Sequence, residues 1–325
     1  MVLTPTQSRL LRLLADGEVH SGAELGEVLG MSRTAVWKAL AGLDDLGLSI
    51  ERAPRRGYRI PGGLDLHDAG AIRAALSEQA LALLDDLRVL AVVDSTNEVL
   101  KATAELPPGR GACCLAEWQT GGRGRLGRHW ISPFAGNLYL SVVWEFDGGI
   151  AVLEGLSLAV GVAVRRALLR LGVSEVQLKW PNDLLRDRAK LGGILVEVTG
   201  DPEGRCRAIV GIGVNVAMPA AAAAAIGQPW RDLSDLGVRR DVLAAAVLDQ
   251  LLPLLCEFPT RGFGGYRDEW EAAHVHGGRR VVISAGNQRV EGIARGVNER
   301  GALGLECGEG IRWFSGGEVS LREQG

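Results

Sequence analysis

The amino-acid sequence predicts an α+β protein in three parts: an N-terminal winged helix-turn-helix, a central α/β domain with a mixed sheet, and a small C-terminal β-barrel. Three observations predict it. The first sixty or so residues hold short, well-capped helices and a basic hairpin. The middle combines strand patterns with long amphipathic helices. The last part, of about forty-five residues, holds only short strands between Gly and Asn turns. We place the domains at residues 1–62, 63–274 and 275–325.

Composition limits the class of protein. The chain has 325 residues, 47% hydrophobic and 23% charged, so each domain can bury a core. The net charge of −3 means that contact with nucleic acid must come from a local basic surface. Five cysteines without a CxxC pair argue for a reducing compartment and against disulfides or a zinc site. With no signal-peptide pattern and no apolar run of membrane-spanning length, we expect a cytoplasmic protein with no membrane partner.

Each of the first three helices begins at a recognisable N-cap. Thr4 precedes a proline and has Gln three residues on, and Ser21 forms a capping box with Glu24. Ser32 caps a third helix, expected over 33–43. Because a tight turn containing Gly joins the second and third helices, they outline a helix-turn-helix.

A basic hairpin follows these helices. We predict paired strands at 48–50 and 58–60, with Arg52, Arg55, Arg56 and Arg59 at the tip and no acid between them. Such a wing suits contact with DNA phosphates. The alternative is a three-helix interaction module with a solvated hairpin. The candidate DNA-contacting residues are Ser21, Ser32, Arg33, Thr34, Trp37, Lys38, Arg55 and Arg56.

Hydrophobic periodicity predicts the elements of the central domain. After a linker at 61–63, helices are expected at 66–84, 98–104, 150–171 and 238–270, and the alanine run 220–225 is a loop or short helix. Strands are expected at 87–93, 112–118, 137–144, 176–180, 194–199 and 208–216. In the C-terminal part, strands at 281–283, 290–294, 303–306 and 311–314 predict a barrel, because closure removes exposed edges.

The stretch Gln119–Arg128 holds four glycines and three arginines between two predicted strands. Glycine lets backbone N–H groups approach a ligand, and arginine is a fixed donor for phosphate and carboxylate. The pattern therefore predicts a mobile anion-binding loop. The alternative is a solvated basic turn. The stretch is neither a Walker A motif nor a GxGxxG turn that opens a helix.

Three further motifs carry candidate chemistry. Ser95-Thr96-Asn97 alone is a helix N-cap. In Lys179–Asp183, Asn182 and Asp183 are suited to a ribose, a phosphate or a metal. Lys190 precedes a strand whose glycines admit a ligand, although a snorkelling lysine is the alternative. Gly211–Asn215 is a strand where a ligand or a second backbone could approach, or a bulge.

Taken in order, these motifs resemble biotin protein ligases. The resemblance rests on Ser95–Asn97, Glu117–Arg128, Lys179–Asp183, Lys190–Glu197 and Gly213–Asn215. With the winged helix, the chain is similar to the bifunctional type that also represses the biotin operon, and the match covers essentially the whole chain. Trp118 and Gly121 depart mildly from the family's pattern.

The resemblance implies a function and partners. An ATP-dependent ligase would use Mg²⁺ to form biotinyl-5′-AMP and would transfer biotin to a lysine of a biotin carboxyl carrier protein. Biotinyl-AMP would also be the co-repressor of a homodimer that binds operator DNA. The C-terminal part would be an SH3-like β-barrel. A lipoate-type acyl ligase, a ligand-sensing repressor without catalysis, and a ligase whose winged helix is only structural stay open as alternatives.

The resemblance also implies roles for residues at matching positions. Lys190 and Arg125 would be catalytic. Biotin would be bound by Ser95, Thr96, Asn97, Gln119, Arg123, Gly124, Arg125 and Lys190. ATP and the adenylate would be bound by Arg125, Arg128, Trp130, Asn182, Lys190 and Trp230. No residue is predicted to hold a metal by itself.

Overall fold

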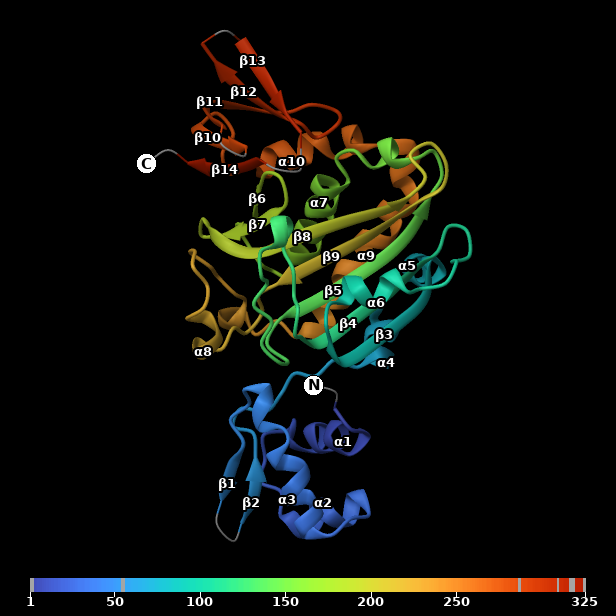
Figure 1. Cartoon of the computed structure of the whole chain (residues 1–325), viewed down its shortest axis with the longest axis vertical. Coiled ribbons are helices and arrows are strands. Elements are labelled where there is room, and N and C mark those ends of the chain that lie inside the picture. The colour runs from blue at the N-terminus through green and yellow to red at the C-terminus, as the bar shows by residue number, and fades with distance from the viewer. Residues whose placement is uncertain (1–2, 54–55, 286–287, 309, 316–318, 324–325) are drawn as a thin grey trace.

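The computed structural model describes residues 3–53, 56–285, 288–308, 310–315 and 319–323. Figure 1 shows three parts along the long axis: the winged helix at one end, the mixed sheet in the middle and an antiparallel sheet at the other end. The predicted α+β class is confirmed. The domain boundaries at 62/63 and 274/275 stay predictions.

The winged helix forms as the capping patterns predict. Its elements are α1 Pro5–Leu14, α2 Gly22–Leu29, α3 Arg33–Ala41, and the hairpin strands β1 Glu51–Ala53 and β2 Gly57–Arg59. The Thr4, Ser21 and Ser32 side chains each accept a backbone hydrogen bond as N-caps, and the first two form capping boxes. Local side-chain chemistry therefore sets where these helices start.

Two boundaries in this domain differ from the prediction. The third helix ends at Ala41, and a 3₁₀ turn, Asp44–Leu46, follows it. The first wing strand begins at Glu51, so the predicted strand at 48–50 is wrong. Leu48 and Ile50 instead pack against the core of this domain. Burial of their side chains, rather than strand pairing, fixes this stretch.

The central sheet has seven strands in the order β3-β4-β5-β9-β8-β7-β6. Strands β3 and β4 pair in parallel and the other neighbours are antiparallel, so the sheet is mixed. The strands are β3 Leu84–Val93, β4 Gly111–Gln119, β5 Leu138–Phe146, β6 Gln177–Lys179, β7 Asp183–Arg186, β8 Ala189–Gly200 and β9 Cys206–Val214.

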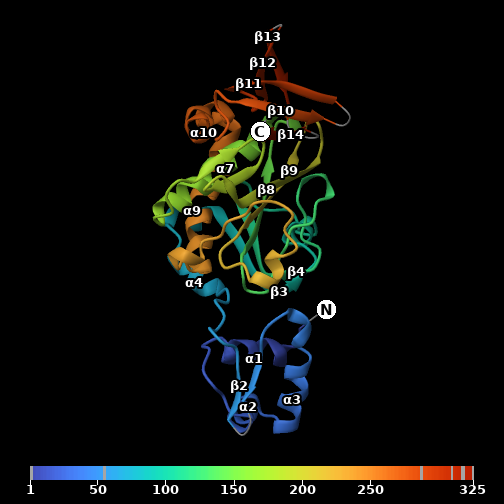
Figure 2. The same cartoon turned by 90° about the vertical axis from the view of Figure 1, so that its left-hand side faces the viewer.

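Helices cover both faces of this sheet (Figures 1 and 2). The long helices α7 Leu156–Arg170 and α9 Arg240–Arg261 pack together on one face, and α6 Thr96–Lys101 contacts β4, β5 and β9 on the other. Side chains along β4 alternate accordingly, since Cys113 joins the core with α7 and α9 while Cys114 joins the smaller core beneath α6.

Several elements of the central domain differ from the sequence prediction. The helix expected at 150–171 is a 3₁₀ turn, Ile150–Leu153, followed by α7. The helix expected at 66–84 is two helices, α4 Ala69–Ala75 and α5 Glu78–Leu83, because the Ser77 side chain caps a new start. Strand β7 was missed. Helix α9 continues through its prolines to Arg261, and η5 Phe263–Tyr266 and α10 Arg267–Ala273 follow it. The alanine run forms the short helix α8 Ala220–Ala223.

Helix α9 is long and apolar enough, by length and composition, to cross a membrane. This differs from the expectation that no segment reaches that length. In the fold it packs against α7 and β5, and 56% of its apolar window is buried inside the structure. A core helix of a globular domain passes the same test, so the feature is weak evidence for a membrane span.

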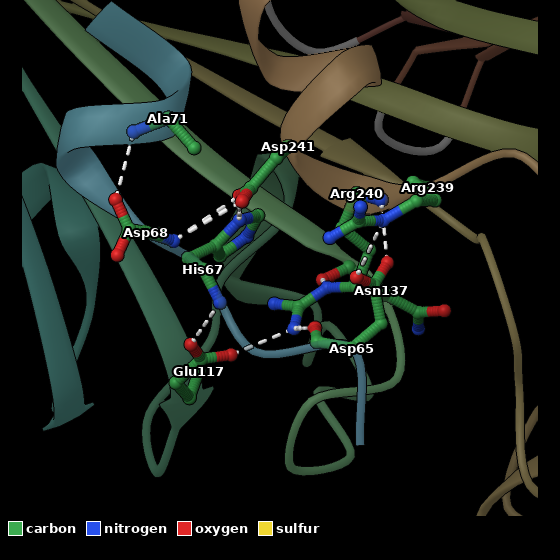
Figure 3. A network of polar contacts seen from close by, with 9 residues as sticks. All are labelled: Asp65, His67, Asp68, Ala71, Glu117, Asn137, Arg239, Arg240 and Asp241. Atoms are coloured by element: carbon green, nitrogen blue, oxygen red, sulfur yellow. Dashed lines mark hydrogen bonds and ion pairs between the residues drawn. The ribbon is translucent and has the colours of Figure 1, made fainter. Parts of the chain in front are cut away.

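A buried polar network fastens the linker of the winged helix to the central domain (Figure 3). The Arg240 guanidinium donates to the Glu117 carboxylate at 2.7 Å, to Asp65 O at 2.7 Å and to Asn137 O at 2.9 Å. The His67 backbone N–H donates to the other Glu117 oxygen at 2.6 Å. The segment that follows the winged helix is therefore held against the central domain by hydrogen bonds.

The C-terminal sheet is antiparallel in the order β13-β12-β11-β10-β14. Its strands are β10 Arg280–Ala285, β11 Gln288–Val297, β12 Leu303–Cys307, β13 Gly310–Phe314 and β14 Val319–Glu323. Four were predicted and β14 was missed. A bulge between Ala294 and Val297 bends β11. In the pairings of the described residues, the ladder ends at β13 and β14 without closing.

Hydrogen bonds join this sheet to the central domain. The Trp180 indole donates to Gly301 O at 3.0 Å, and Val275 N donates to Leu178 O at 3.0 Å. Beside this joint the His274 ring lies against Trp270 in a tilted arrangement, with 4.5 Å between centroids, and both His274 nitrogens are buried. The strand that precedes Asn182 is thus supported by the C-terminal sheet.

We expect His274 to make folding stability fall at mildly acidic pH. Burial, with a smaller effect of His276, lowers the pKa of His274 from 6.5 to about 3. The unfolded chain then binds a proton below pH 6.5 that the folded chain excludes, so stability present above that pH is lost as pH falls. The loss should reach about 2 kcal/mol at pH 5.

Urea unfolding at pH 7.5 and pH 5 would measure this loss. His274→Phe should reduce it, whereas His129→Ala, at an exposed position, should leave it unchanged. An unchanged pH dependence in His274→Phe would contradict the expectation.

Candidate functional site

One cavity of about 540 Å³ collects motifs that lie far apart in the sequence. Its walls come from the start of α6, the end of β4, the Gly/Arg loop, and the edges of β7, β8 and β9. The lining includes every candidate ligase residue: Ser95, Thr96, Asn97, Gln119, Arg123, Gly124, Arg125, Arg128, Trp130, Asn182, Lys190 and Trp230.

The floor of the cavity is a buried, uncharged polar cluster. The Gln119 side-chain oxygen accepts hydrogen bonds from the Thr96 backbone at 2.9 Å and from the Thr96 hydroxyl at 3.1 Å. The Ser141 hydroxyl donates to Asn97 Oδ1 at 2.6 Å and lies 2.6 Å from the Thr96 hydroxyl. Although Ser95 begins α6, its side chain makes no capping bond. The floor can therefore offer donors and acceptors to a neutral polar ligand.

Two glycines on β9 make room around this floor. A Cβ on Gly211 would lie 2.5 Å from Asn97 Oδ1, and one on Gly213 would lie 2.7 Å from the Trp130 ring. Both distances are too short for a side chain, so these glycines allow Asn97 and Trp130 to lie directly on the strand. The sequence predicted approach of a ligand or a second backbone, or a bulge; the structure instead places side chains against these two glycines, with no register shift in the strand pairing there.

Cationic side chains gather at the other end of the cavity. The Lys190 ammonium lies 2.7 Å from Asp183 Oδ1 and 5.7 Å from the Trp130 ring centroid. The Arg125 guanidinium donates to Asn182 Oδ1 at 3.5 Å, and burial lowers the pKa of Arg125. The Lys190 side chain is only 18% exposed, which does not fit a lysine that snorkels to solvent.

The Gly/Arg loop folds as a short hairpin in this structure. Gly124 N donates to Arg128 O at 2.7 Å, and Trp130 N donates to Gly122 O at 2.9 Å. Leu126, with φ 57°, is 61% exposed at the tip. The backbone thus closes on itself, and residues along most of the loop line the cavity.

The two central arginines of this loop have different partners. Arg125 turns inward to Asn182, whereas the Arg123 guanidinium donates to Glu98 on α6 and lies 3.8 Å from Asp94. Glu98 in turn accepts from Lys101, and these hydrogen bonds keep the pKa of Glu98 below its usual value. The structure therefore brings Arg125, but not Arg123, to the cationic cluster.

Several side chains around this cavity, Ser141 and Asp183 among them, were not among the site residues predicted from sequence. Ser141 organises the floor, and its only sequence signal is a small polar residue in an otherwise apolar strand. Asp183 forms an ion pair with Lys190. The sequence indicated Asp183 as a possible ligand, but it did not indicate this ion pair, because the two residues are seven positions apart.

Most of the described candidate DNA-contacting residues are exposed, and two of them are helix N-caps. Arg33, Thr34, Trp37 and Lys38 are exposed on α3, as predicted, and Arg56 is exposed at the wing. The Ser21 and Ser32 hydroxyls serve as N-caps. Arg55 lies outside the described residues.

Two wing arginines form ion pairs with acidic residues that lie outside the stretch from Arg52 to Arg59. Arg52 lies 3.3 Å from Asp44, and Arg59 lies 2.6 Å from Glu51. Strand pairing places Glu51 directly opposite Arg59. The described wing is therefore less positive than its sequence indicates.

Family models match all three parts of the chain. Residues 6–59 match an HTH domain, residues 89–215 match the biotin/lipoate A/B protein ligase family, and residues 276–322 match the biotin protein ligase C terminal domain.

Whole-chain relatives give the same result. The chain is 40% identical to the bifunctional ligase/repressor BirA of Escherichia coli (strain K12), over 97% of this chain and 96% of that protein. It is 35% identical to the biotin–[acetyl-CoA-carboxylase] ligase of Paracoccus denitrificans, over 71% of this chain and 98% of that protein.

A solved structure agrees with them. A biotin protein ligase from Aquifex aeolicus, in complex with biotin and ATP, superposes with a TM-score of 0.62 and 31% identity, over 74% of this chain and all of that one. The chain belongs to the biotin protein ligases, in the form of the bifunctional ligase/repressors.

We expect the contact of Arg123 with Glu98 to limit opening of the loop. In Glu98→Gln the ion pair is lost, and trypsin should cut between Arg123 and Arg128 faster. The increase should be at most about fivefold, because exposed ion pairs contribute about 0–1 kcal/mol. Mass spectrometry of the first fragments measures the rate.

Glu105→Gln, which removes another exposed ion pair to an arginine, is the matched control and should cut at the wild-type rate. A loop that resists trypsin equally in Glu98→Gln and wild type would show that this contact does not hold it.

Proposed function

We propose that this chain is an ATP-dependent biotin protein ligase and a biotin-responsive repressor. It forms biotinyl-5′-AMP and transfers the biotinyl group to a lysine of a biotin carboxyl carrier protein in the cytoplasm. The adenylate-bound homodimer then binds operator DNA. The observation that carries the proposal is one cavity with a neutral polar floor at one end and half-buried cations at the other.

The floor suits the cyclic urea of biotin. A urea ring presents two N–H donors and one carbonyl acceptor, which hydroxyl and amide side chains can match without a charge. Ser95, Thr96, Asn97 and Gln119 are the proposed partners, and Ser141 positions two of them. A buried ligand that left this cluster unpaired would bind poorly, since buried polar groups without partners are costly.

The cationic end suits the first chemical step. The biotin carboxylate oxygen attacks the α-phosphorus of ATP, the bond from that phosphorus to the bridging oxygen breaks, and diphosphate leaves. Because both reactants are anions, their approach needs fixed positive charge. Arg125 and Lys190 supply it in a partly dehydrated cavity.

Oxygen ligands for Mg²⁺ lie beside these cations. The described residues contain no cluster of three or more His, Cys, Asp or Glu side chains that could hold a metal alone. Mg²⁺, however, often takes one or two carboxylates together with nucleotide phosphates. Asp183 and Asn182 fit that pattern, and a bound ion would supply further charge neutralisation there.

The remaining candidates surround the nucleotide. Trp130 and Trp230 offer aromatic faces for adenine, and Arg128 extends toward the phosphates. Arg123 and Gly124 contribute when the loop rearranges around biotin, which requires Arg123 to leave Glu98. In the second step the acceptor lysine amine attacks the anhydride carbonyl and AMP leaves. A closed loop protects that anhydride from water until the acceptor arrives.

The substrate is tested by incubating the protein with ATP, Mg²⁺ and biotin, lipoate or octanoate, and detecting acyl-AMP by mass spectrometry. Biotinyl-AMP is the expected product. Lipoyl- or octanoyl-AMP without biotinyl-AMP would identify a lipoate-type ligase, and no acyl-AMP at all would leave a repressor without catalysis.

Lys190→Ala should slow adenylate formation by about 10²–10³-fold, as loss of one oxyanion-stabilising group does. Diphosphate release measures the rate. Lys38→Ala, in the winged helix, should form adenylate at the wild-type rate. A Lys190→Ala enzyme of normal rate would remove that lysine from the mechanism.

Biotin with ATP should tighten operator binding and shift the protein to a dimer. A dimer presents two winged helices on a twofold axis, and binding that depends on dimerisation is linked to the ligand that promotes it. Gel shift and analytical ultracentrifugation, with and without biotin and ATP, measure both effects. Equal DNA affinity in the two conditions would refute the co-repressor role.

A further inference from the structure

Trp37 is a large apolar side chain that the winged helix leaves in solvent. It is the fifth residue of α3, and 49% of its surface is exposed, while Val36 and Leu40 beside it are buried. About half of this large apolar side chain stays in water, and the fold does not use that part. The tryptophan is therefore available to a partner.

The surroundings of Trp37 identify a polyanion as that partner. It lines a groove of about 310 Å³ between α3, the start of α2 and the wing, together with Arg33 and Arg56. Among the described residues, no carboxylate pairs with Arg33, Arg56 or the neighbouring Lys38. An apolar ring between unpaired cations suits a ligand with anionic edges and some apolar groups between them, and a DNA major groove offers phosphates at its edges and thymine methyl groups on its floor.

The position of Trp37 within the groove favours contact with bases. Arg33 and Trp37 are four residues apart, so both lie on one face of α3. The Arg33 stem is held close to α2 and the wing, since a Cβ on Gly22 would lie 3.2 Å from Arg33 Cγ and 3.3 Å from the Tyr58 ring. With Arg33 fixed at the helix start, the indole is the next side chain to reach the major groove.

We infer that Trp37 reads the 5-methyl group of thymine in the operator. In the major groove, thymine alone presents a methyl group, and apolar side chains recognise it by direct contact. This inference rests on the proposed binding of operator DNA. It adds sequence specificity. The indole selects one or more thymines in each half-site, while the unpaired cations bind the phosphates.

The test uses a duplex that the wild-type protein selects from a random library in the presence of biotin, ATP and Mg²⁺. Each thymine is then replaced singly by deoxyuridine, which lacks only the methyl group. At the positions read by Trp37 the wild-type affinity should fall about fourfold, the equivalent of one buried carbon.

The protein variants decide which residue is responsible. Trp37→Ala should bind the parent duplex more weakly and should be indifferent to deoxyuridine at those positions, and Trp37→Phe should keep part of the discrimination. Trp313→Ala is the matched control, because Trp313 is 50% exposed on the C-terminal sheet and should leave the wild-type pattern intact. Adenylate formation by each variant reports that it is folded.

Two results would overturn the inference alone: wild-type protein that binds the duplex but ignores every deoxyuridine, or Trp37→Ala that discriminates as wild type does. A wild-type protein that recovers no duplex from the library would instead refute operator binding, and the inference would fall with it.

Discussion

The buried ion pair between Arg240 and Glu117 is the contact on which the rest of the structure depends. Their side chains are 1% and 6% exposed and lie 2.7 Å apart. Removing two such charges from water costs several kcal/mol, which their attraction repays only if the remaining donors and acceptors are also satisfied. Asp65, His67 and Asn137 meet that condition for most of these groups. The ion pair therefore forms only when the segment around Asp65 and His67, strand β4, the start of β5 and helix α9 are all in place.

That requirement joins the cavity to the winged helix. Glu117 lies two residues before Gln119, and the Asn137 side chain accepts from Val216 N, next to Asn215. Glu117 and Asn137, which lie on either side of the loop in sequence, thus both accept hydrogen bonds from Arg240, as Asp65 O does. Phe134, just beyond the loop, packs in the core of the winged helix. The segment that follows the loop is therefore in contact with the core of the winged helix.

Local chemistry could be predicted from the sequence, and long-range pairing could not. Capping serines and threonines set helix starts because their partners lie three residues away. The glycines and arginines of the loop indicate an anion site by residue type alone. In contrast, Arg240 resembles any solvent-facing arginine of an amphipathic helix, and nothing near it in sequence points to Glu117. The pairing of Arg123 with Glu98 and the role of Ser141 are equally invisible, because each depends on which strands become neighbours.

In the proposed function, the charge of the winged helix would make dimerisation an effective switch. With Arg52 and Arg59 neutralised by Asp44 and Glu51, the cations without an acidic partner among the described residues of this surface are Arg33, Lys38 and Arg56. Few phosphate contacts release few counterions, so one module binds DNA weakly at physiological salt. Two modules on a rigid dimer bind more tightly, because once the first module is bound the second meets its half-site at a high effective concentration. In the proposed homodimer, this weakness of the single module would make DNA binding depend on the event that brings two modules together.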